Sequence, residues 1–374
     1  MREFDRFRQA DTRRALLELA VTLAPFVLLW IGMATAVRLE AWWLYGLLML
    51  PTAGLLVRLF MIQHDCGHGS FFPRRQANDW VGRAMGVLTL TPYDHWRRSH
   101  AIHHASCGNL DRRGIGDVDT LTTGEYLALG RWGRLRYRLY RHPAVMFGLG
   151  PSYLFVLQNR LPLGFMSKGW MPWVSTMGTN AALLALVAAL TWAVGASTFL
   201  VVHLPIVVLA ATAGVWLFYI QHQFEETHWD EAKDWSFHDA ALHGSSHYDL
   251  PPVLRWFTGN IGIHHVHHLA SRIPFYRLPE VLRSHPELGA MGRVTLLESF
   301  RCVRLTLWDT ANRRMVSFRE LVNGDPAKNP DTRHRQHEAP SSVTAGVHVP
   351  PHQIDGLWPE RRGSIQGLDR ERNA

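Results

Sequence analysis

Four long apolar stretches dominate the pattern of hydrophobic and polar positions along this 374-residue chain. They run over residues 17–37, 41–62, 177–194 and 198–220. Their charged residues are few, with Glu18 at the edge of the first stretch and Arg58 near the end of the second. About 20 apolar residues in a helix cross a hydrocarbon core about 30 Å thick. The pattern therefore predicts an all-α, polytopic membrane protein with four transmembrane helices arranged as two hairpins.

Two shorter apolar stretches, at 81–90 and 144–157, fall below the length of a crossing helix. The second contains Gly148, Gly150 and Pro151. We therefore predict that both are interfacial or re-entrant. A true crossing at 144–157 would invert the topology of everything that follows it.

Basic residues give the orientation, because loops rich in Lys and Arg stay on the cytosolic side. Five arginines lie in the first 14 residues and twelve in residues 63–143, whereas Arg38 is alone in the first hairpin turn and the second turn has none. The sequence thus predicts a multi-pass protein of the inner (cytoplasmic) membrane, with a helical cytosolic cap formed by residues 63–176 and 221–322. The net charge of +8 flanks apolar runs, which favours anionic lipid or an acidic protein partner over nucleic acid.

The composition changes after residue 322, where the chain becomes rich in Pro, Asp, Arg, Gly and His without periodicity. Such a segment does not bury enough apolar surface to fold. We predict one membrane domain over residues 1–322 and a disordered tail over 323–374.

Histidines gather in three clusters among the 22 of the chain. The first is His64-Asp-Cys-Gly-His68, the second His100-Ala-Ile-His103-His104, and the third His264-His265-Val266-His267-His268. Residues three and four apart share one face of a helix, so each cluster can direct two or three imidazoles the same way. His222 follows the fourth apolar stretch and is a further candidate.

The predicted topology returns all these clusters to one membrane face, because the first follows two crossings and the third follows four. A single histidine at the end of a span is usually an ordinary interfacial residue. Two HxxHH clusters and an HxxxH on one face are hard to explain without metal. His95 and His265, beside the clusters, are better explained as structural or supporting residues.

Imidazole suits zinc, copper, nickel and iron. Zinc sites take three or four protein ligands, so eight or nine imidazoles are too many for one ion and suit two ions with open positions. None of the three clusters contains the Glu-x-x-His pattern of soluble di-iron proteins. Iron with open positions can bind and reduce O2, which makes two Fe ions with O2 as co-substrate the preferred interpretation.

The clusters and their flanking residues resemble those of the integral-membrane fatty acid desaturases, over about residues 20–300. The resemblance rests on the HxxxH, HxxHH and HxxHH order, on the Gly69-Ser-Phe-Phe72 that follows the first cluster, on Trp96 before the second and on Thr258-Gly-Asn before the third. The bacterial acyl-lipid desaturases and the omega-6 (delta-12) group are the most similar. Asp94-His95 departs from the pattern, where an apolar or aromatic residue is expected.

The resemblance implies eight iron ligands from the three clusters, namely His64, His68, His100, His103, His104, His264, His267 and His268. It implies a ninth histidine after the fourth span, for which His222 fits best and His228 is the alternative. Asp65 is expected to hydrogen-bond a ligand imidazole and fix its orientation.

The resemblance also implies oxygen-dependent desaturation of a fatty acyl lipid, giving a cis double bond. The chain has no dinucleotide-binding glycine motif and no cysteine cluster, so we expect a separate ferredoxin- or flavodoxin-type electron donor. A membrane di-iron hydroxylase of a lipid, alkane, sterol or carotenoid is the alternative. A metal transporter or sensor is disfavoured, because His203 is nearly alone within the spans.

Truncation after Gly324 tests the prediction for the tail. Because the tail has no apolar periodicity and follows the last cluster, the truncated protein is expected to keep its metal and most of its activity. Metal analysis and an acyl-lipid assay of the shortened chain measure both. Loss of metal would show that His334 or His337 in the tail folds back onto the site.

Overall fold

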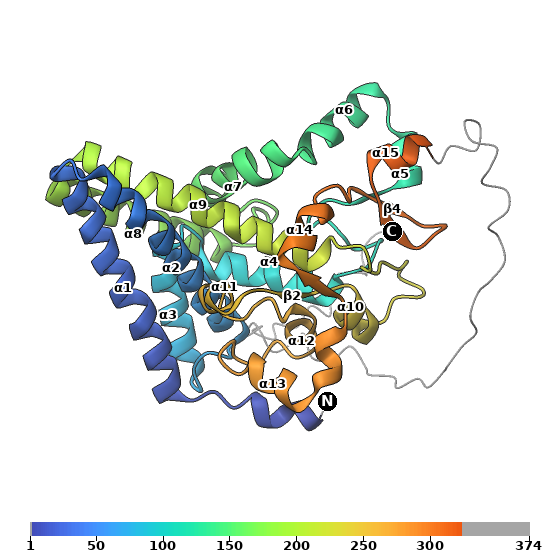
Figure 1. The fold of residues 1–374 in the computed structure, drawn as a ribbon, viewed down its shortest axis with the longest axis horizontal. Helices are drawn as coiled ribbons and strands as arrows, with labels where there is room; N and C mark the ends of the chain where they lie inside the picture. Colours follow the sequence, from blue (N-terminus) through green and yellow to red (C-terminus); the bar gives the residue numbers. More distant parts are fainter. Residues whose placement is uncertain (1, 324–374) are drawn as a thin grey trace, which may run out of the picture. The chain divides into compact units, whose positions relative to one another are not determined.

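The computed structural model describes residues 2–323 of the chain. Four long helices and a set of short helices and strands make up this part (Figure 1). Apart from its first residue, the predicted disordered tail lies outside the described residues.

The four long helices are those that the hydrophobic pattern predicted, and each is long and apolar enough to cross a membrane. They are α1 (Thr12–Arg38), α2 (Trp42–His68), α8 (Met171–Val194) and α9 (Ala196–His222). A turn at Leu39–Ala41 joins the first pair and Gly195 joins the second, so the two predicted hairpins are present. Three of the four helices run beyond the predicted apolar stretches by five or six residues at one end.

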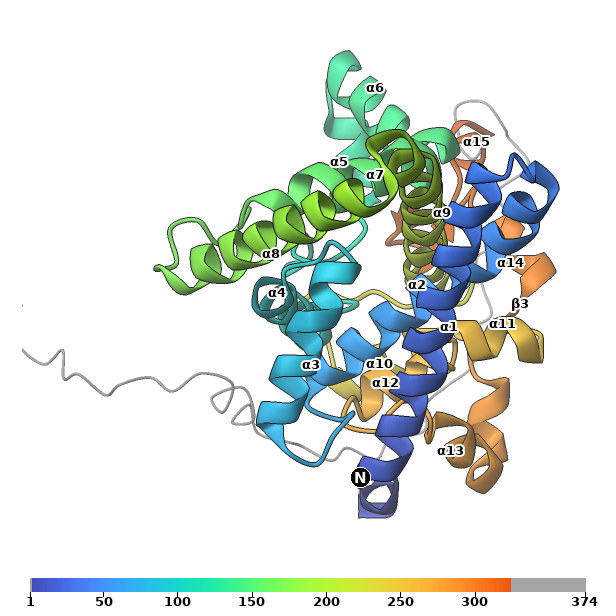
Figure 2. The same cartoon turned by 90° about the vertical axis from the view of Figure 1, so that its left-hand side faces the viewer.

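The helix α8 exposes most of its apolar side chains. Its buried residues are Pro172 and Thr176 near its start, whereas Leu184 is 71% and Trp192 90% exposed. Figure 2 shows α8 diverging from α9, α2 and α1. An apolar helix with so little protein around it needs lipid as its solvent, so the protein is a membrane protein.

Short helices form the cap between and after the hairpins. They are α3 (Arg75–Leu88), α4 (Tyr93–Ser106), α5 (Thr123–Ala128), α6 (Arg131–Tyr140), α7 (Gly150–Ser152), α10 (Phe237–His243), α11 (Pro252–Phe257), α12 (His264–Leu269), α13 (Leu278–Ser284), α14 (Leu296–Cys302) and α15 (Phe318–Asn323), with 3-10 helices at Arg2–Phe7, Gln158–Arg160 and Pro286–Ala290.

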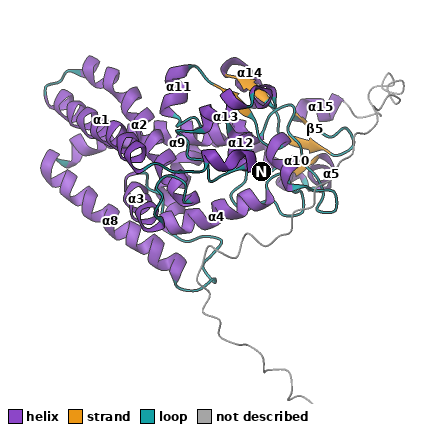
Figure 3. Cartoon of the chain, turned by 90° about the horizontal axis from the view of Figure 1, so that it is seen from below, coloured by secondary structure: helices purple, strands orange, loops and turns teal. Residues whose placement is uncertain are grey.

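Five short strands interrupt the otherwise helical cap (Figure 3). They are β1 (Leu121–Thr122), β2 (His247–Asp249), β3 (Arg293–Thr295), β4 (Leu307–Asp309) and β5 (Arg314–Val316). The strand β4 pairs with β1 in parallel and with β5 antiparallel, and β2 pairs with β3 in parallel. Because each strand has only two or three residues, the predominantly α-helical fold predicted from the sequence is confirmed.

The apolar stretch at 144–157 forms an irregular helical segment, with π-helical turns at Val145–Leu149 and Tyr153–Leu157 on either side of α7. It packs against α9, where Thr212 donates a hydrogen bond of 2.8 Å to the carbonyl of Phe147. It is not among the helices long enough to cross a membrane. Its interfacial or re-entrant placement stays a prediction, as does that of residues 81–90, which cover the second half of α3 and the two residues after it.

A buried ion pair joins α1 to α2 near the cap. Arg58 and Glu18 lie 2.5 Å apart with side chains only 2% and 5% exposed. The guanidinium of Arg58 also donates to Thr22 and to the carbonyl of Trp256, and it lies 4.2 Å above the Trp256 ring. This one side chain therefore holds both helices of the first hairpin and the cap helix α11 together.

Replacing Glu18 by leucine is expected to destabilise the fold by about 3–5 kcal/mol, because Arg58 would remain buried without a counter-ion. The double variant Glu18→Leu/Arg58→Met is expected to recover most of that loss. Thermal unfolding in detergent measures both, with Glu231→Leu as a control, since Glu231 pairs with Lys233 at the surface. If the double variant were as unstable as the single one, packing rather than charge would account for the effect.

Candidate metal centre

Four helix ends bring the predicted histidines to one place. His64 and His68 lie in the last turns of α2, and Gly69 ends that helix with a left-handed φ of 66°. The helix α4 carries the second cluster, His222 is the last residue of α9, and α12 carries the third cluster. The N–H groups of His264 and His265 both bond to the carbonyl of Ser246, which fixes the start of α12.

Five of the histidines form a first group, made of His64, His68, His100, His104 and His267. Their Nε2 atoms face one another. That of His100 lies 3.0 Å from His64 and 3.1 Å from both His68 and His104, and His267 lies 3.1 Å from His104. The first group therefore draws on α2, α4 and α12 together.

The other four form a second group, made of His103, His222, His264 and His268. The Nε2 of His222 lies 3.2 Å from that of His103 and 3.0 Å from that of His264, which is 3.1 Å from that of His268. The rings of His104 and His268 stack 4.1 Å apart and thus join the two groups. All nine histidines named by the sequence are brought together.

In three of the rings the Nδ1 atom faces a hydrogen-bond acceptor, and the Nε2 atom points into the group. His64 Nδ1 lies 3.1 Å from Asp65 Oδ1, His103 Nδ1 lies 2.5 Å from Asp117 Oδ1, and His222 Nδ1 lies 3.2 Å from the carbonyl of Gly244. A ring that donates its proton from Nδ1 presents a lone pair at Nε2. These three rings then present Nε2 lone pairs, that of His64 to the first group and those of His103 and His222 to the second.

Burial disfavours the charged form of five of these rings. It lowers the pKa of His100, His104, His264, His267 and His268 well below the usual histidine value, and the neighbouring histidines lower it further. Neutral imidazole is the form that binds metal. At neutral pH these five rings are therefore ready nitrogen donors rather than a cluster of positive charge.

The donor set fits a metal ion well. With metal–nitrogen bonds of about 2.1 Å, ligands at right angles have nitrogens about 3.0 Å apart, close to the Nε2 separations in both groups. Converging lone pairs without donors between them would otherwise repel. Each group can hold a metal ion, and the five and four nitrogens leave positions open for other ligands.

The remaining histidines near the clusters have other partners. His228 lies outside both groups, with its Nε2 2.7 Å from Asp230 and 2.7 Å from Arg313. His265 bonds through Nε2 to the carbonyl of Leu288, and His95 packs against Phe165. The unexpected Asp94 beside it forms ion pairs with Arg83 and Arg97.

Two contacts were not foreseen from the sequence. Asp117 belongs to the irregular segment after α4 and reaches back fourteen residues to His103, so no helical spacing points to it. Trp96 stacks on His100 with ring centroids 4.5 Å apart. A Cβ on Gly67 would lie 2.8 Å from that indole, which explains why the residue before His68 is glycine. Asp65, which the sequence did single out, also accepts the backbone N–H of Phe275 at 2.6 Å.

Comparison with known proteins agrees with this arrangement. The sequence model of the family described as "Fatty acid desaturase" matches residues 40–299, more than half of the chain. A fatty acid desaturase of Bacillus subtilis is 43% identical over 333 residues, covering 88% of this chain and 93% of that protein.

Two cyanobacterial proteins from Synechocystis are more distant relatives. One, named an sn-1 acyl-lipid omega-3 desaturase (ferredoxin), is 30% identical over 70% of this chain and 72% of its own length. The other, named an sn-1 oleoyl-lipid 12-desaturase, is 25% identical over 63% of this chain and 67% of its own. The histidine groups, the four membrane helices and these relatives lead to one conclusion: this chain belongs to the fatty acid desaturase family.

Proposed function

We propose that this protein introduces a cis double bond into fatty acyl chains of membrane lipids, with two iron ions held by the nine histidines. The proposal rests on the two histidine groups, one with five Nε2 atoms and one with four. The stacked rings of His104 and His268 join the two groups. Two ions side by side with open positions suit the activation of O2. The names of the relatives support a lipid-linked acyl chain as the substrate.

The residues of this chain have separate tasks in that reaction. His64, His68, His100, His104 and His267 would hold one iron, and His103, His222, His264 and His268 the other. Asp65 and Asp117 would hold the rings of His64 and His103 by their Nδ1 atoms. The bound irons supply the oxidising power, drawn from O2, that removes hydrogen from an unactivated C–H bond.

The reaction consumes electrons from outside the chain. Removing two hydrogen atoms from adjacent methylenes and reducing O2 to two waters takes two further electrons and two protons. The name of the omega-3 desaturase from Synechocystis includes ferredoxin, which supports a ferredoxin-type donor here. Such carriers are commonly acidic, and the net charge of +8 with its arginine-rich loops is complementary.

We place the histidine groups on the cytosolic side of the inner membrane, from the arginine distribution. Tags within residues 105–140 and after Pro251 should both be accessible from the cytosol, and a tag beside Glu40 only from the other side. Opposite sides for the first two tags would mean that residues 144–157 cross the membrane.

Expression in a host of defined lipid composition tests the activity. Mass-spectrometric location of new double bonds is expected to find unsaturated acyl chains that are missing with an empty vector. A hydroxylated lipid in place of an unsaturated one would identify the alternative hydroxylase.

Replacing His267 or His222 by alanine is expected to lower iron content and abolish product, because each removes one Nε2 from a group. For His222 the loss should be at least about 10-fold. His228→Ala is the control, since His228 bonds to Asp230 and Arg313 instead. Iron analysis of purified variants decides between them, and a larger loss for His228→Ala would contradict the assignment of the ninth ligand.

Asp117 is expected to matter almost as much as a ligand. Replacing it by alanine leaves the buried Nδ1 of His103 without its acceptor and should weaken iron binding by about 10- to 100-fold. Asp117→Asn, which keeps an acceptor oxygen but no charge, should lie in between. Iron retention against a chelator measures the series, and Asp119→Ala, two residues away on the surface, should behave as the unchanged protein.

A further inference from the structure

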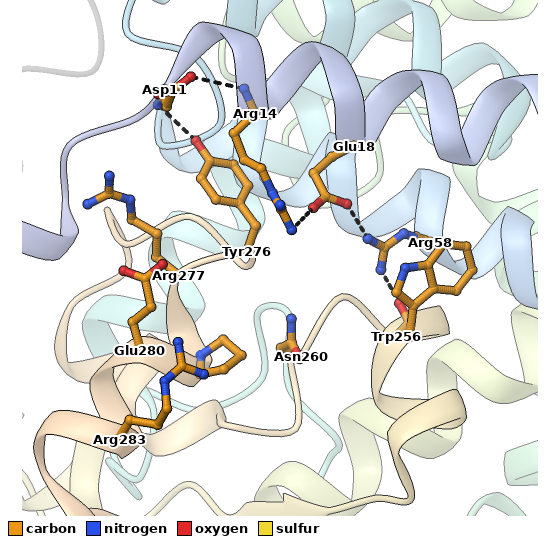
Figure 4. Close-up of a pocket in the computed structure, with 11 residues that line it drawn as sticks. Asp11, Arg14, Glu18, Arg58, Trp256, Asn260, Tyr276, Arg277, Glu280 and Arg283 are labelled. Carbon is orange, nitrogen blue, oxygen red and sulfur yellow. Dashed lines mark hydrogen bonds and ion pairs between the residues drawn. The ribbon is translucent and has the colours of Figure 1, made fainter.

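A hollow of about 460 Å³ lies where the start of α1 meets the cap, away from the histidine groups (Figure 4). The first turns of α1 supply one wall, Arg58 and Trp256 another, and Asn260 with the segment from Tyr276 to Arg283 the rest. A second hollow of about 450 Å³, lined in part by Arg6, shares Arg277, Glu280 and Arg283 with the first. Five arginines thus border these two neighbouring hollows.

The ion pairs inside the first hollow do not involve all of its arginine side chains. Glu18 is taken by both Arg14, at 2.7 Å, and Arg58. Asp11 caps α1 by accepting the N–H of Arg14. The guanidinium of Arg277 has one hydrogen bond among the described residues, which it donates to the backbone carbonyl of Arg6. Among the described residues no hydrogen bond or ion pair is found for the Arg283 guanidinium. Four arginines in the first hollow therefore face three carboxylates, those of Asp11, Glu18 and Glu280, and Arg6 in the second hollow adds another positive charge.

The surroundings of the hollow are apolar on two sides. On α1, Leu17 and Val21 are exposed, by 51% and 37%. On α11, Val253 is 67% and Trp256 39% exposed. The residues from Asp11 to Glu18 begin a membrane-crossing helix, so the hollow lies at the depth of lipid headgroups. A ligand in this hollow would contact arginine side chains at one end and apolar side chains at the other.

We propose that this hollow binds the phosphate headgroup of an anionic phospholipid, with Arg277 and Arg283 as the main partners of the phosphate. Guanidinium groups bind phosphate through paired N–H donors, and those of Arg283 are available. The exposed faces of α1 and α11 would lie beside the acyl chains of the same lipid. The site is separate from the histidine groups, and it stands whether or not the proposed reaction is correct.

The full-length protein in detergent can be titrated with dihexanoylphosphatidylglycerol, with dihexanoylphosphatidylcholine and with inorganic phosphate. The glycerol lipid is expected to bind at least about tenfold more tightly than the choline lipid, because the hollow has an excess of positive charge. Inorganic phosphate at equal concentration should not displace it. Equal binding of the two lipids, or displacement by inorganic phosphate, would overturn the proposal, the latter in favour of a soluble phosphate ligand.

Three variants locate the site. Arg277→Gln/Arg283→Gln is expected to weaken binding of the glycerol lipid at least about tenfold, since it removes both main partners. Glu280→Gln should strengthen it, because it removes the competing carboxylate, and a gain of affinity does not arise from misfolding. Arg301→Gln, which removes one exposed positive charge on α14 outside the hollow, should change nothing. Unchanged binding in both hollow variants would refute the assignment.

Discussion

The rest of this structure depends on one constraint, the crowding of nine buried imidazole rings into two groups in which neighbouring Nε2 atoms lie about 3 Å apart. Such an arrangement has no stability of its own, because burial removes the water that would solvate the ring nitrogens. The surrounding protein has to hold the rings in place. Asp65, Asp117 and the carbonyl of Gly244 do so from the outer side of three rings, and Trp96 supports a fourth by stacking.

The membrane helices and the cap share this task unequally. The helices α2 and α9 cross the membrane and end in the histidine groups, so their last turns are rigidly placed by long apolar packing. The cap adds α4 and α12, which are short and depend on contacts with neighbouring loops. Asp65 connects the two parts, since one of its oxygens faces His64 in α2 and the other accepts the N–H of Phe275 beyond α12.

The features that could be predicted from the sequence are long apolar stretches and residues that recur at helical spacing. The apolar stretches identified all four membrane helices, and the three- and four-residue spacings identified the histidines that the fold brings together. Asp117 escaped prediction because it reaches His103 from an irregular segment. The pairing of Glu18 with Arg58 escaped because each looked like a charge at the margin of a span, and only the packing of α1 on α2 joins them. The short strands carry too few residues for any pattern.

The helix α2 is continuous from its membrane-spanning part to the histidine groups, so a change in its tilt would displace His64 and His68. Its 27 residues span about 40 Å, and a tilt of about 5° around its far end would move His68 by about 3.5 Å, more than the spacing between neighbouring ring nitrogens. Bilayer thickness sets the tilt that a crossing helix prefers. Arg58, ten residues before His68, bonds to Glu18 of α1 and to the carbonyl of Trp256 in α11, and these contacts oppose such a tilt near the histidine end of α2.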